Sequence, residues 1–145
     1  MLDKNLTGKE YPATKYIVSI EKIREFAKAI SDNNALYSDE EFAKKSKHGE
    51  IIAPPTFCVI FAIKPFIAAC TDPALNINLT NLVHGEQDFY FYNTIKNGDE
   101  IFTDGKIIDI QTKRNLDFLT VETISRLKNN EIVVKGIWTA IIANP

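Results

Sequence analysis

The feature that most constrains the fold is a long apolar segment in the middle of the chain, from Ile51 to Cys70. Its central part begins with Pro54 and Pro55, which a helix tolerates in its first turn, and continues apolar on nearly every side. A helix of this kind has to be wrapped by other elements. Pro65 lies inside the segment and is expected to kink or interrupt the helix near Ala62, because its ring cannot donate a hydrogen bond and collides with the preceding turn.

The chain changes its periodicity on the two sides of this segment. Apolar residues at helical spacing predict an amphipathic helix over Glu21–Ser31, and a short helix is expected over Asp39–Lys45. Strand patterns dominate after Asn81. The expected strands are Gln87–Tyr92, Glu100–Asp109, Leu116–Ser125 and Glu131–Ala143, with an early strand over Lys15–Ser19. The late strands predict an antiparallel meander.

The last expected strand is apolar on both faces. One face carries Val133, Ile137 and Ile141, and the other includes Trp138 and Ile142. One face can cover the central helix, and the other needs the first helix or a second copy of the sheet. The expected order is one strand, then helices, then four strands around a buried helix. This order describes an α+β hot-dog fold. We expect a single domain over residues 1–145 that forms a double hot-dog dimer.

Composition favours a compact domain with a small-molecule or protein partner. The 145 residues are 45% hydrophobic and 25% charged, and the formal charge of −2 is spread evenly without a basic block. Nucleic acid and an anionic membrane surface are therefore not expected as partners. The first residues lack an apolar signal core, and prolines and Lys64 interrupt the longest apolar stretch, so a cytoplasmic location without a membrane span is expected.

Motifs for metal, cofactor or nucleophilic chemistry do not emerge. Cys58 and Cys70 would lie about 18 Å apart on one continuous helix, so buried reduced thiols are expected. Two distant histidines give no ligand spacing, the glycines form no phosphate-binding loop, and there is no Gly-x-Ser-x-Gly elbow. We therefore predict no metal and no cofactor.

The residues best suited to acid–base chemistry follow the first expected helix. Asp32, Asn34 and Tyr37 form a polar loop beside the apolar segment, a suitable place for acid–base chemistry on a molecule with an apolar tail. The same residue types also cap helices and bend loops for local reasons, and that interpretation stays open. A tyrosine with a pKa near 10 is a poor proton acceptor at neutral pH.

Four motifs in unbroken order carry a family resemblance. They are Ile51-Ile52-Ala53-Pro54-Pro55-Thr56-Phe57, Leu82-Val83-His84-Gly85-Glu86-Gln87, Asn97-Gly98-Asp99 and Leu116-Asp117-Phe118. Together they resemble the signatures of MaoC-like dehydratases and (R)-specific hydratases, over about Thr7 to Ala143. The resemblance implies a hot-dog subunit that adds water to an enoyl chain, or removes it from a 3-hydroxyacyl chain, carried as a thioester on coenzyme A or an acyl carrier protein.

The resemblance also assigns residues. Catalytic members present Asp, Asn and His on the loop after the first helix, and this chain matches at Asp32 and Asn34 but has Tyr37 in place of the His. Such a Tyr resembles the substrate-binding subunits of two-subunit 3-hydroxyacyl-thioester dehydratases, which pair with a catalytic hot-dog partner. The leading interpretation is a hydro-lyase subunit with weak or no activity alone.

Three alternatives remain open. The chain is a self-sufficient hydratase that uses Asp32 with Tyr37 or His84, a non-catalytic acyl-thioester binding protein, or a hot-dog thioesterase. The enolate-like oxygen needs hydrogen bonds from backbone N–H groups, and the candidate donors are Ala53, Thr56 and Phe57. Phe61 is a further substrate-binding candidate. His84 is also readable as a structural histidine. The sequence leaves open the acyl chain length, coenzyme A versus carrier protein, and homo- versus heterodimer.

Overall fold

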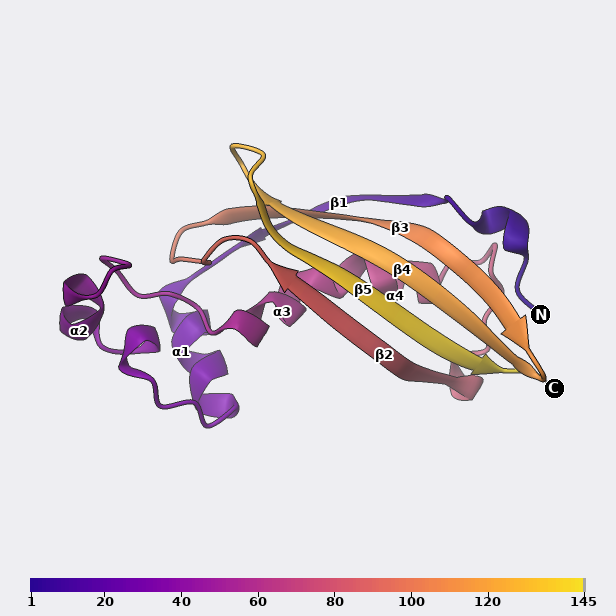
Figure 1. Cartoon of the computed structure of the whole chain (residues 1–145), viewed down its shortest axis with the longest axis horizontal. Helices are drawn as coiled ribbons and strands as arrows, with labels where there is room; N and C mark the ends of the chain where they lie inside the picture. Colours follow the sequence, from indigo (N-terminus) through magenta and orange to yellow (C-terminus); the bar gives the residue numbers. More distant parts are fainter. Residues whose placement is uncertain (145) are drawn as a thin grey trace.

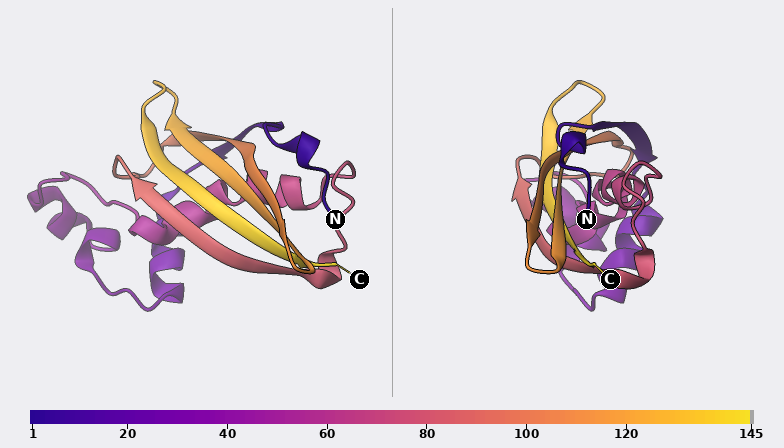
Figure 2. Two further views of the ribbon diagram at one scale, coloured as in Figure 1. Left: turned by 45° about the vertical axis from the view of Figure 1, so that its right-hand side comes forward. Right: turned by 90° about the vertical axis from the view of Figure 1, so that its right-hand side faces the viewer.

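The computed structural model describes residues 1–144, so Pro145, the last residue of the expected domain, lies outside the described part. A five-stranded antiparallel sheet with strand order β1-β3-β4-β5-β2 curves over the central helices (Figure 1). The strands are β1 (Glu10–Ile17), β2 (Leu82–Phe91), β3 (Glu100–Lys113), β4 (Leu116–Leu127) and β5 (Ile132–Ala143). Viewed along the molecule, the sheet wraps partly around these helices (Figure 2).

The helices precede the large strands in the chain, and short 3-10 turns lie between them. Helix α1 spans Ile20–Ala29, α2 spans Glu40–Lys45, α3 spans Val59–Ala62 and α4 spans Lys64–Cys70. The 3-10 turns are η1 (Lys4–Leu6), η2 (Ala35–Tyr37), η3 (Pro55–Cys58) and η4 (Leu79–Asn81). Within residues 1–144, no helix is long and apolar enough to cross a membrane.

The central helix is interrupted where the sequence predicts. Helix α3 ends at Ala62 and α4 begins at Lys64, with Pro65 in the first turn of α4. The sheet approaches this break very closely, because a Cβ atom added at Gly105 would lie 2.4 Å from the Cβ atom of Pro65. The glycine therefore lets β3 pack against the start of α4.

The two cysteines are free and buried, one on each part of the interrupted helix. Burial raises the pKa of the Cys58 thiol to about 12 and that of the Cys70 thiol to about 11. Both thiols are therefore protonated at neutral pH, as expected for buried reduced cysteines.

Two strands begin earlier than the sequence pattern indicates. Strand β1 starts at Glu10 rather than Lys15, and β2 starts at Leu82 rather than Gln87. Each strand contains a register shift, between Tyr11 and Thr14 in β1 and between His84 and Glu86 in β2. A bulge interrupts the two-residue alternation on which strand prediction depends, so the first residues of both strands do not look like strand in the sequence.

The core lies between the sheet and the interrupted helix. Trp138 of β5 is fully buried, and its ring stacks on that of Phe66 of α4 with the centroids 5.5 Å apart. On the other face of β5, Val133 is buried whereas Ile137 and Ile141 are half-buried. The outer face of the last strand is therefore less completely covered than the face against the helix.

Candidate functional site

The loop after α1 is held by its own backbone and by two side chains. The chain leaves the helix through Ser31, which adopts a left-handed φ of 57°, and the Asp32 N–H donates to Ala27 O at 2.9 Å. Asp32 Oδ1 accepts the Asn34 N–H at 3.1 Å, and Asn34 Oδ1 accepts the Leu36 N–H at 3.0 Å. Both candidate residues therefore also serve as turn and cap residues.

Asp32 retains an oxygen that these turns do not use. The residue is half-buried, and within residues 1–144 its Oδ2 atom accepts no hydrogen bond. A carboxylate with one oxygen fixed by the backbone and the other free has a defined orientation and can still contact water or a ligand.

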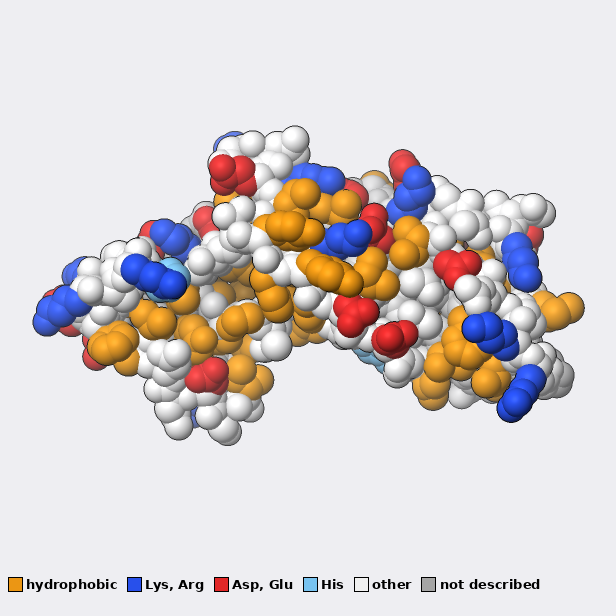
Figure 3. Space-filling model, viewed as in Figure 1, with side chains coloured by type: hydrophobic (Ala, Val, Ile, Leu, Met, Phe, Trp, Pro, Cys, Tyr) orange, Lys and Arg blue, Asp and Glu red, His pale blue; other side chains and the backbone are white. Residues whose placement is uncertain are grey.

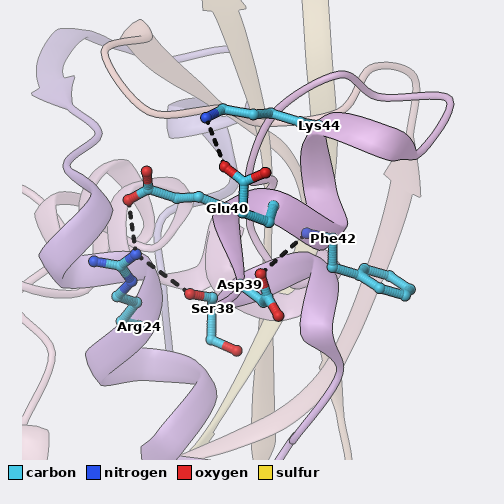
Figure 4. A network of polar contacts seen from close by, with 7 residues as sticks. Arg24, Ser38, Asp39, Glu40, Phe42 and Lys44 are labelled. Carbon is cyan, nitrogen blue, oxygen red and sulfur yellow. Dashed lines mark hydrogen bonds and ion pairs between the residues drawn. The ribbon is translucent and has the colours of Figure 1, made fainter.

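A polar network fixes the far side of the loop to α1 (Figure 4). Arg24 donates to Ser38 O at 3.3 Å and pairs with Glu40 at 3.0 Å, while Asp39 caps α2 by accepting the Phe42 N–H at 3.0 Å. The exposed Arg24–Glu40 pair contributes little stability by itself. Its geometric effect is to hold the start of α2, and so the end of η2, against α1.

Tyr37 and Ala53 are the candidate residues that line a pocket. The Tyr37 side chain is buried and forms part of the wall of this pocket, which has a volume of about 320 Å³. The other lining residues come from the start of the central segment and from the chain that follows β2: Ile52, Ala53, Pro54, Pro55, Phe91, Tyr92, Asn93, Thr94 and Ile95. The Ala53 N–H donates to Ile95 O at 2.8 Å, so a backbone hydrogen bond joins these two walls.

Electrostatics keep the Tyr37 hydroxyl protonated. Burial raises its pKa, the charge of Asp32 raises it further, and the Asn34 side chain partly opposes both effects. The structure thus brings together the three loop residues that the sequence singles out. At neutral pH the hydroxyl is a hydrogen-bond donor and acceptor, but it does not act as a base without a large free-energy cost.

Of the three N–H groups expected to face a substrate oxygen, two are already engaged. The Ala53 N–H is bonded to Ile95, and the Phe57 N–H donates to Pro54 O at 2.9 Å. The Thr56 N–H has no backbone acceptor within residues 1–144, and the residue is exposed, but it does not line the Tyr37 pocket. Thr56 is the one of the three that keeps a free donor.

Phe57 and Phe61 belong to the core. They are 0% and 1% exposed, and the Phe57 ring lies 5.5 Å from Phe26 and 6.3 Å from Tyr16 between centroids. Phe61 packs on Tyr16 at 5.7 Å. These rings fill the space between α1, β1 and α3, so an acyl chain could run along this face only if they moved.

His84 lies apart from the loop. The residue is exposed at the start of β2, and its ring is 5.8 Å from Trp138 and 5.4 Å from Phe66. Phe91, which lines the Tyr37 pocket, is seven positions further along the strand, and this corresponds to about 23 Å. Within one subunit, His84 therefore does not reach the Tyr37 hydroxyl.

The sequence alone does not identify the wall formed by residues 91–95. The sequence predicts that the aromatic set Phe89, Tyr90, Phe91 and Tyr92 belongs to the core and to an interface. In the single chain, Phe91 and Tyr92 are 51% and 57% exposed and line the pocket. An antiparallel bridge between Ile52 and Lys96 brings this stretch to the start of the central segment. The aromatic residues at the end of β2 are the one signal in the sequence for this wall. Their position beside the start of the central segment is a tertiary contact that the sequence does not indicate.

Comparisons with known proteins agree with this architecture. Residues 5–135 match the family profile of the FAS1-like dehydratase domain region. A UPF0336 protein of Saccharopolyspora erythraea is 43% identical over 121 residues, which span 83% of this chain and 78% of the relative.

Solved structures show the same fold at low sequence identity. The HadBC complex, a 3R-hydroxyacyl-ACP dehydratase of Mycobacterium tuberculosis, matches with a TM-score of 0.78 at 23% identity over 94% of this chain and 96% of that chain. A MaoC-like dehydratase of Rhodospirillum rubrum matches with a TM-score of 0.75 at 15% identity over 96% and 93%. The expected hot-dog fold, shared with a MaoC-like dehydratase, is confirmed. The chain belongs to the family of the FAS1-like dehydratase domain region.

Proposed function

We propose that this chain is the substrate-binding subunit of a two-subunit (R)-3-hydroxyacyl-thioester dehydratase, or enoyl-thioester hydratase, and that a second hot-dog subunit supplies the catalytic base. The observation that carries the proposal is Tyr37, which occupies the wall of the loop pocket with a raised pKa. Hydration of an enoyl thioester needs a group that accepts a proton from water at neutral pH. A buried, protonated phenol does not supply that group.

The free-energy argument separates this function from the self-sufficient alternative. A tyrosine with an ordinary pKa near 10 must overcome roughly 3 pKa units, about 4 kcal/mol, to ionise at pH 7. That alone lowers the rate more than a hundredfold, and burial beside Asp32 adds to the cost. The intact hydroxyl is suited instead to hold a thioester oxygen or a water molecule by hydrogen bonds.

The pocket walls support binding of an acyl thioester. Apolar groups of Pro54, Pro55 and Phe91 line the same pocket of about 320 Å³ as Tyr37. Apolar walls with few polar groups are typical of small-molecule sites. The HadBC protein, which has the same fold, acts as a complex of two subunits, and we extend that arrangement to this chain.

The test is hydration of crotonyl-coenzyme A by the purified chain, alone and mixed with a hot-dog subunit that carries the Asp, Asn and His of the catalytic members. We expect little or no turnover alone and clear turnover in the mixture, because only the mixture contains a base. Robust turnover by the chain alone would refute the proposal. Binding without turnover under both conditions would favour a non-catalytic acyl-thioester binding protein.

The matched control in the mixture is Tyr37→Phe, which keeps the ring and removes the hydroxyl. If Tyr37 positions substrate, this variant raises KM more than it lowers kcat, because the base lies on the other subunit. An unchanged KM would show that the hydroxyl does not contact the substrate.

A further inference from the structure

A cluster of four aromatic rings fills the interior beside the Tyr37 pocket. The members of this aromatic cluster are Tyr16 of β1, Phe26 of α1, Phe57 of η3 and Phe61 of α3. The rings of Phe26 and Phe57 meet edge to face with their centroids 5.5 Å apart, and those of Phe57 and Phe61 meet at 6.5 Å with an interplanar angle of 65°. Aromatic rings prefer such contacts, which add stability beyond burial alone. The four rings therefore hold one another in place.

The centre of the aromatic cluster leaves no room for a ligand. Phe57 and Phe61 are fully buried, and neither of them lines the pocket. The ring of Tyr16 is covered in turn by Lys64, whose Nζ atom lies 5.7 Å from the ring centroid. Protein interiors are packed as densely as organic crystals, so these rings give up space only if their neighbours move as well.

The aromatic cluster lies where an acyl chain would continue inward from the pocket. The pocket reaches the start of the central segment at Pro54 and Pro55, and the Phe57 N–H donates to Pro54 O at 2.9 Å. An acyl chain that followed the apolar segment inward from Tyr37 would therefore meet the Phe57 ring.

The carrier end of a thioester has to leave through the other side of the pocket, where Phe91 and Tyr92 are exposed. On the face shown in Figure 3, hydrophobic side chains gather where the part of the molecule that carries α1 and α2 joins the sheet. The carrier is too large for the pocket and stays in solvent on this side. The acyl end is then directed at the aromatic cluster.

The volume of the pocket limits the length of the acyl chain. The pocket measures about 320 Å³, which is near the lower end of the roughly 300–1,000 Å³ of small-molecule sites. An apolar cavity of about 150 Å³ holds one benzene molecule, so the pocket has room for about two such rings, or roughly twelve non-hydrogen atoms. The thioester group and the adjoining atoms of the carrier share this space with the acyl chain.

We infer that Phe57 and Phe61 close the inner end of the Tyr37 pocket, and that the site therefore takes short acyl chains, of roughly six carbon atoms or fewer. The inference rests on the proposed function for the acyl thioester as the ligand. It adds the length of the acyl chain and the two residues that set it. In this arrangement Phe57 and Phe61 form the end wall and do not lie along the acyl chain.

The test is equilibrium binding of saturated acyl-coenzyme A thioesters, because each methylene group that enters an apolar site tightens binding about fourfold. Isothermal titration calorimetry compares the butyryl, hexanoyl, octanoyl and decanoyl thioesters, with the chain alone and with the two-subunit mixture. The wild-type affinity is expected to rise up to the hexanoyl thioester and then to change by less than about twofold per step. Continued tightening up to the decanoyl thioester would overturn the inference, because the acyl chain would then have apolar room beyond the pocket.

The variant Phe61→Ala removes one ring of the end wall. It is expected to bind the octanoyl thioester at least about tenfold more tightly than the hexanoyl thioester, since two more methylene groups become buried. Phe61→Leu keeps the core better filled and should shift the preference in the same direction, by at least about threefold. It replaces the alanine variant if circular dichroism shows that the latter does not fold. A folded Phe61 variant with the wild-type dependence on chain length would overturn the inference.

The matched control is Phe66→Leu. Phe66 is also a buried ring of the interrupted helix, but it stacks on Trp138 with the centroids 5.5 Å apart and does not line the pocket. This variant also removes a core ring, and it should keep the wild-type limit at the hexanoyl thioester. An equal shift in the control would overturn the inference, because a general loosening of the core would then explain the binding of longer chains.

Binding is measured without turnover, so the two proposals fail separately. A limit at the hexanoyl thioester, together with absent hydration in the two-subunit assay, would leave the chain-length assignment intact and refute the proposed function. Hydration of a decenoyl thioester as fast as that of crotonyl-coenzyme A would refute the chain-length limit alone. Absent binding of every thioester to both the chain and the mixture would overturn the inference.

Discussion

At the scale of single residues, position 37 decides whether the loop after α1 can act as a base. Asp32, Asn34 and Tyr37 lie together as the sequence indicates. Burial and, after it, the charge of Asp32 raise the pKa of the tyrosine, and Asn34 partly opposes this rise. The backbone turns also use one side-chain oxygen each of Asp32 and Asn34. The local structural role and the proposed role in binding are therefore compatible, because they involve different atoms of Asp32.

The residue-scale prediction is a gain of function by Tyr37→His. An imidazole with a pKa near 6.5 beside Asp32 can accept a proton at neutral pH, and a positioned general base contributes about 10²–10⁴-fold. We expect the single chain carrying this change to hydrate crotonyl-coenzyme A at least about a hundredfold faster than the wild-type chain. The decrease in absorbance of the enoyl thioester at neutral pH measures the hydration rate.

Two controls sharpen this result. Adding Asp32→Asn to Tyr37→His should remove most of the gain, since the carboxylate that orients the imidazole is lost. A folded Tyr37→His variant with no gain would show that the loop does not approach the substrate. The predicted rate should fall as the pH drops below the histidine pKa, because the protonated ring no longer accepts a proton.

At the scale of elements, the interrupted helix follows from the sequence, but its reason lies in the sheet. Pro65 predicts the break, and the structure confirms it between Ala62 and Lys64. Nothing in the sequence indicates that Gly105, forty residues later, packs onto that proline. The two positions are coupled because the curved strand and the start of α4 approach more closely than a β-carbon allows.

The element-scale prediction is that Gly105→Ala destabilises the fold. The added Cβ atom would lie 2.4 Å from the Cβ atom of Pro65, on a rigid ring that cannot move aside alone. Overpacking of this kind costs about 1–3 kcal/mol in the free energy of unfolding. Urea unfolding monitored by Trp138 fluorescence measures the loss.

A double-mutant cycle tests the cause. Pro65→Gly removes the opposing Cβ atom, so in its presence the cost of Gly105→Ala should decrease markedly. Equal costs in both backgrounds would mean that the glycine is needed for another reason.

At the scale of the whole molecule, the candidate site and the two chain ends lie at opposite ends of the sheet (Figure 1). Two acidic residues secure the end with the termini. Asp72 follows α4 and accepts hydrogen bonds from the Tyr11 hydroxyl at 2.8 Å and from the Ala74 N–H at 2.9 Å, and it pairs with Lys9. Asp117 is buried at the start of β4 and accepts the Leu2 N–H at 2.7 Å.

Acid should loosen this end. The Lys9 ammonium and the hydrogen bonds to Asp72 lower its pKa to about 2. Burial opposes ionisation of Asp117, but hydrogen bonds from the Thr112 hydroxyl and the Leu2 N–H outweigh it, so the net direction of its pKa is also down. Carboxyl groups with depressed folded-state pKa values stabilise the fold above their unfolded pKa near 3.9, and this stabilisation is lost as the pH falls toward 2.

We therefore expect the free energy of unfolding to fall as the pH is lowered from about 5 to 2. Asp72→Asn should lower the stability at pH 7 and remove part of this pH dependence. Urea titrations at a series of pH values provide the measurement. Glu21→Gln, at an exposed position without an ion pair within residues 1–144, is the control and should keep the wild-type slope. An unchanged slope in Asp72→Asn would assign the acid sensitivity elsewhere.

The sequence by itself determined the wrapped apolar segment, its break at Pro65, the antiparallel strands and the grouping of Asp32, Asn34 and Tyr37. These are local properties, readable from periodicity, proline geometry and short spacings. Only the tertiary structure decided that residues 91–95 form the wall opposite Tyr37, that Phe57 and Phe61 fill the core, and that His84 lies about 23 Å along β2 from the pocket. Those facts depend on which distant segments pair in the sheet, and bulges in β1 and β2 hide that pairing from the alternation of residues along the chain.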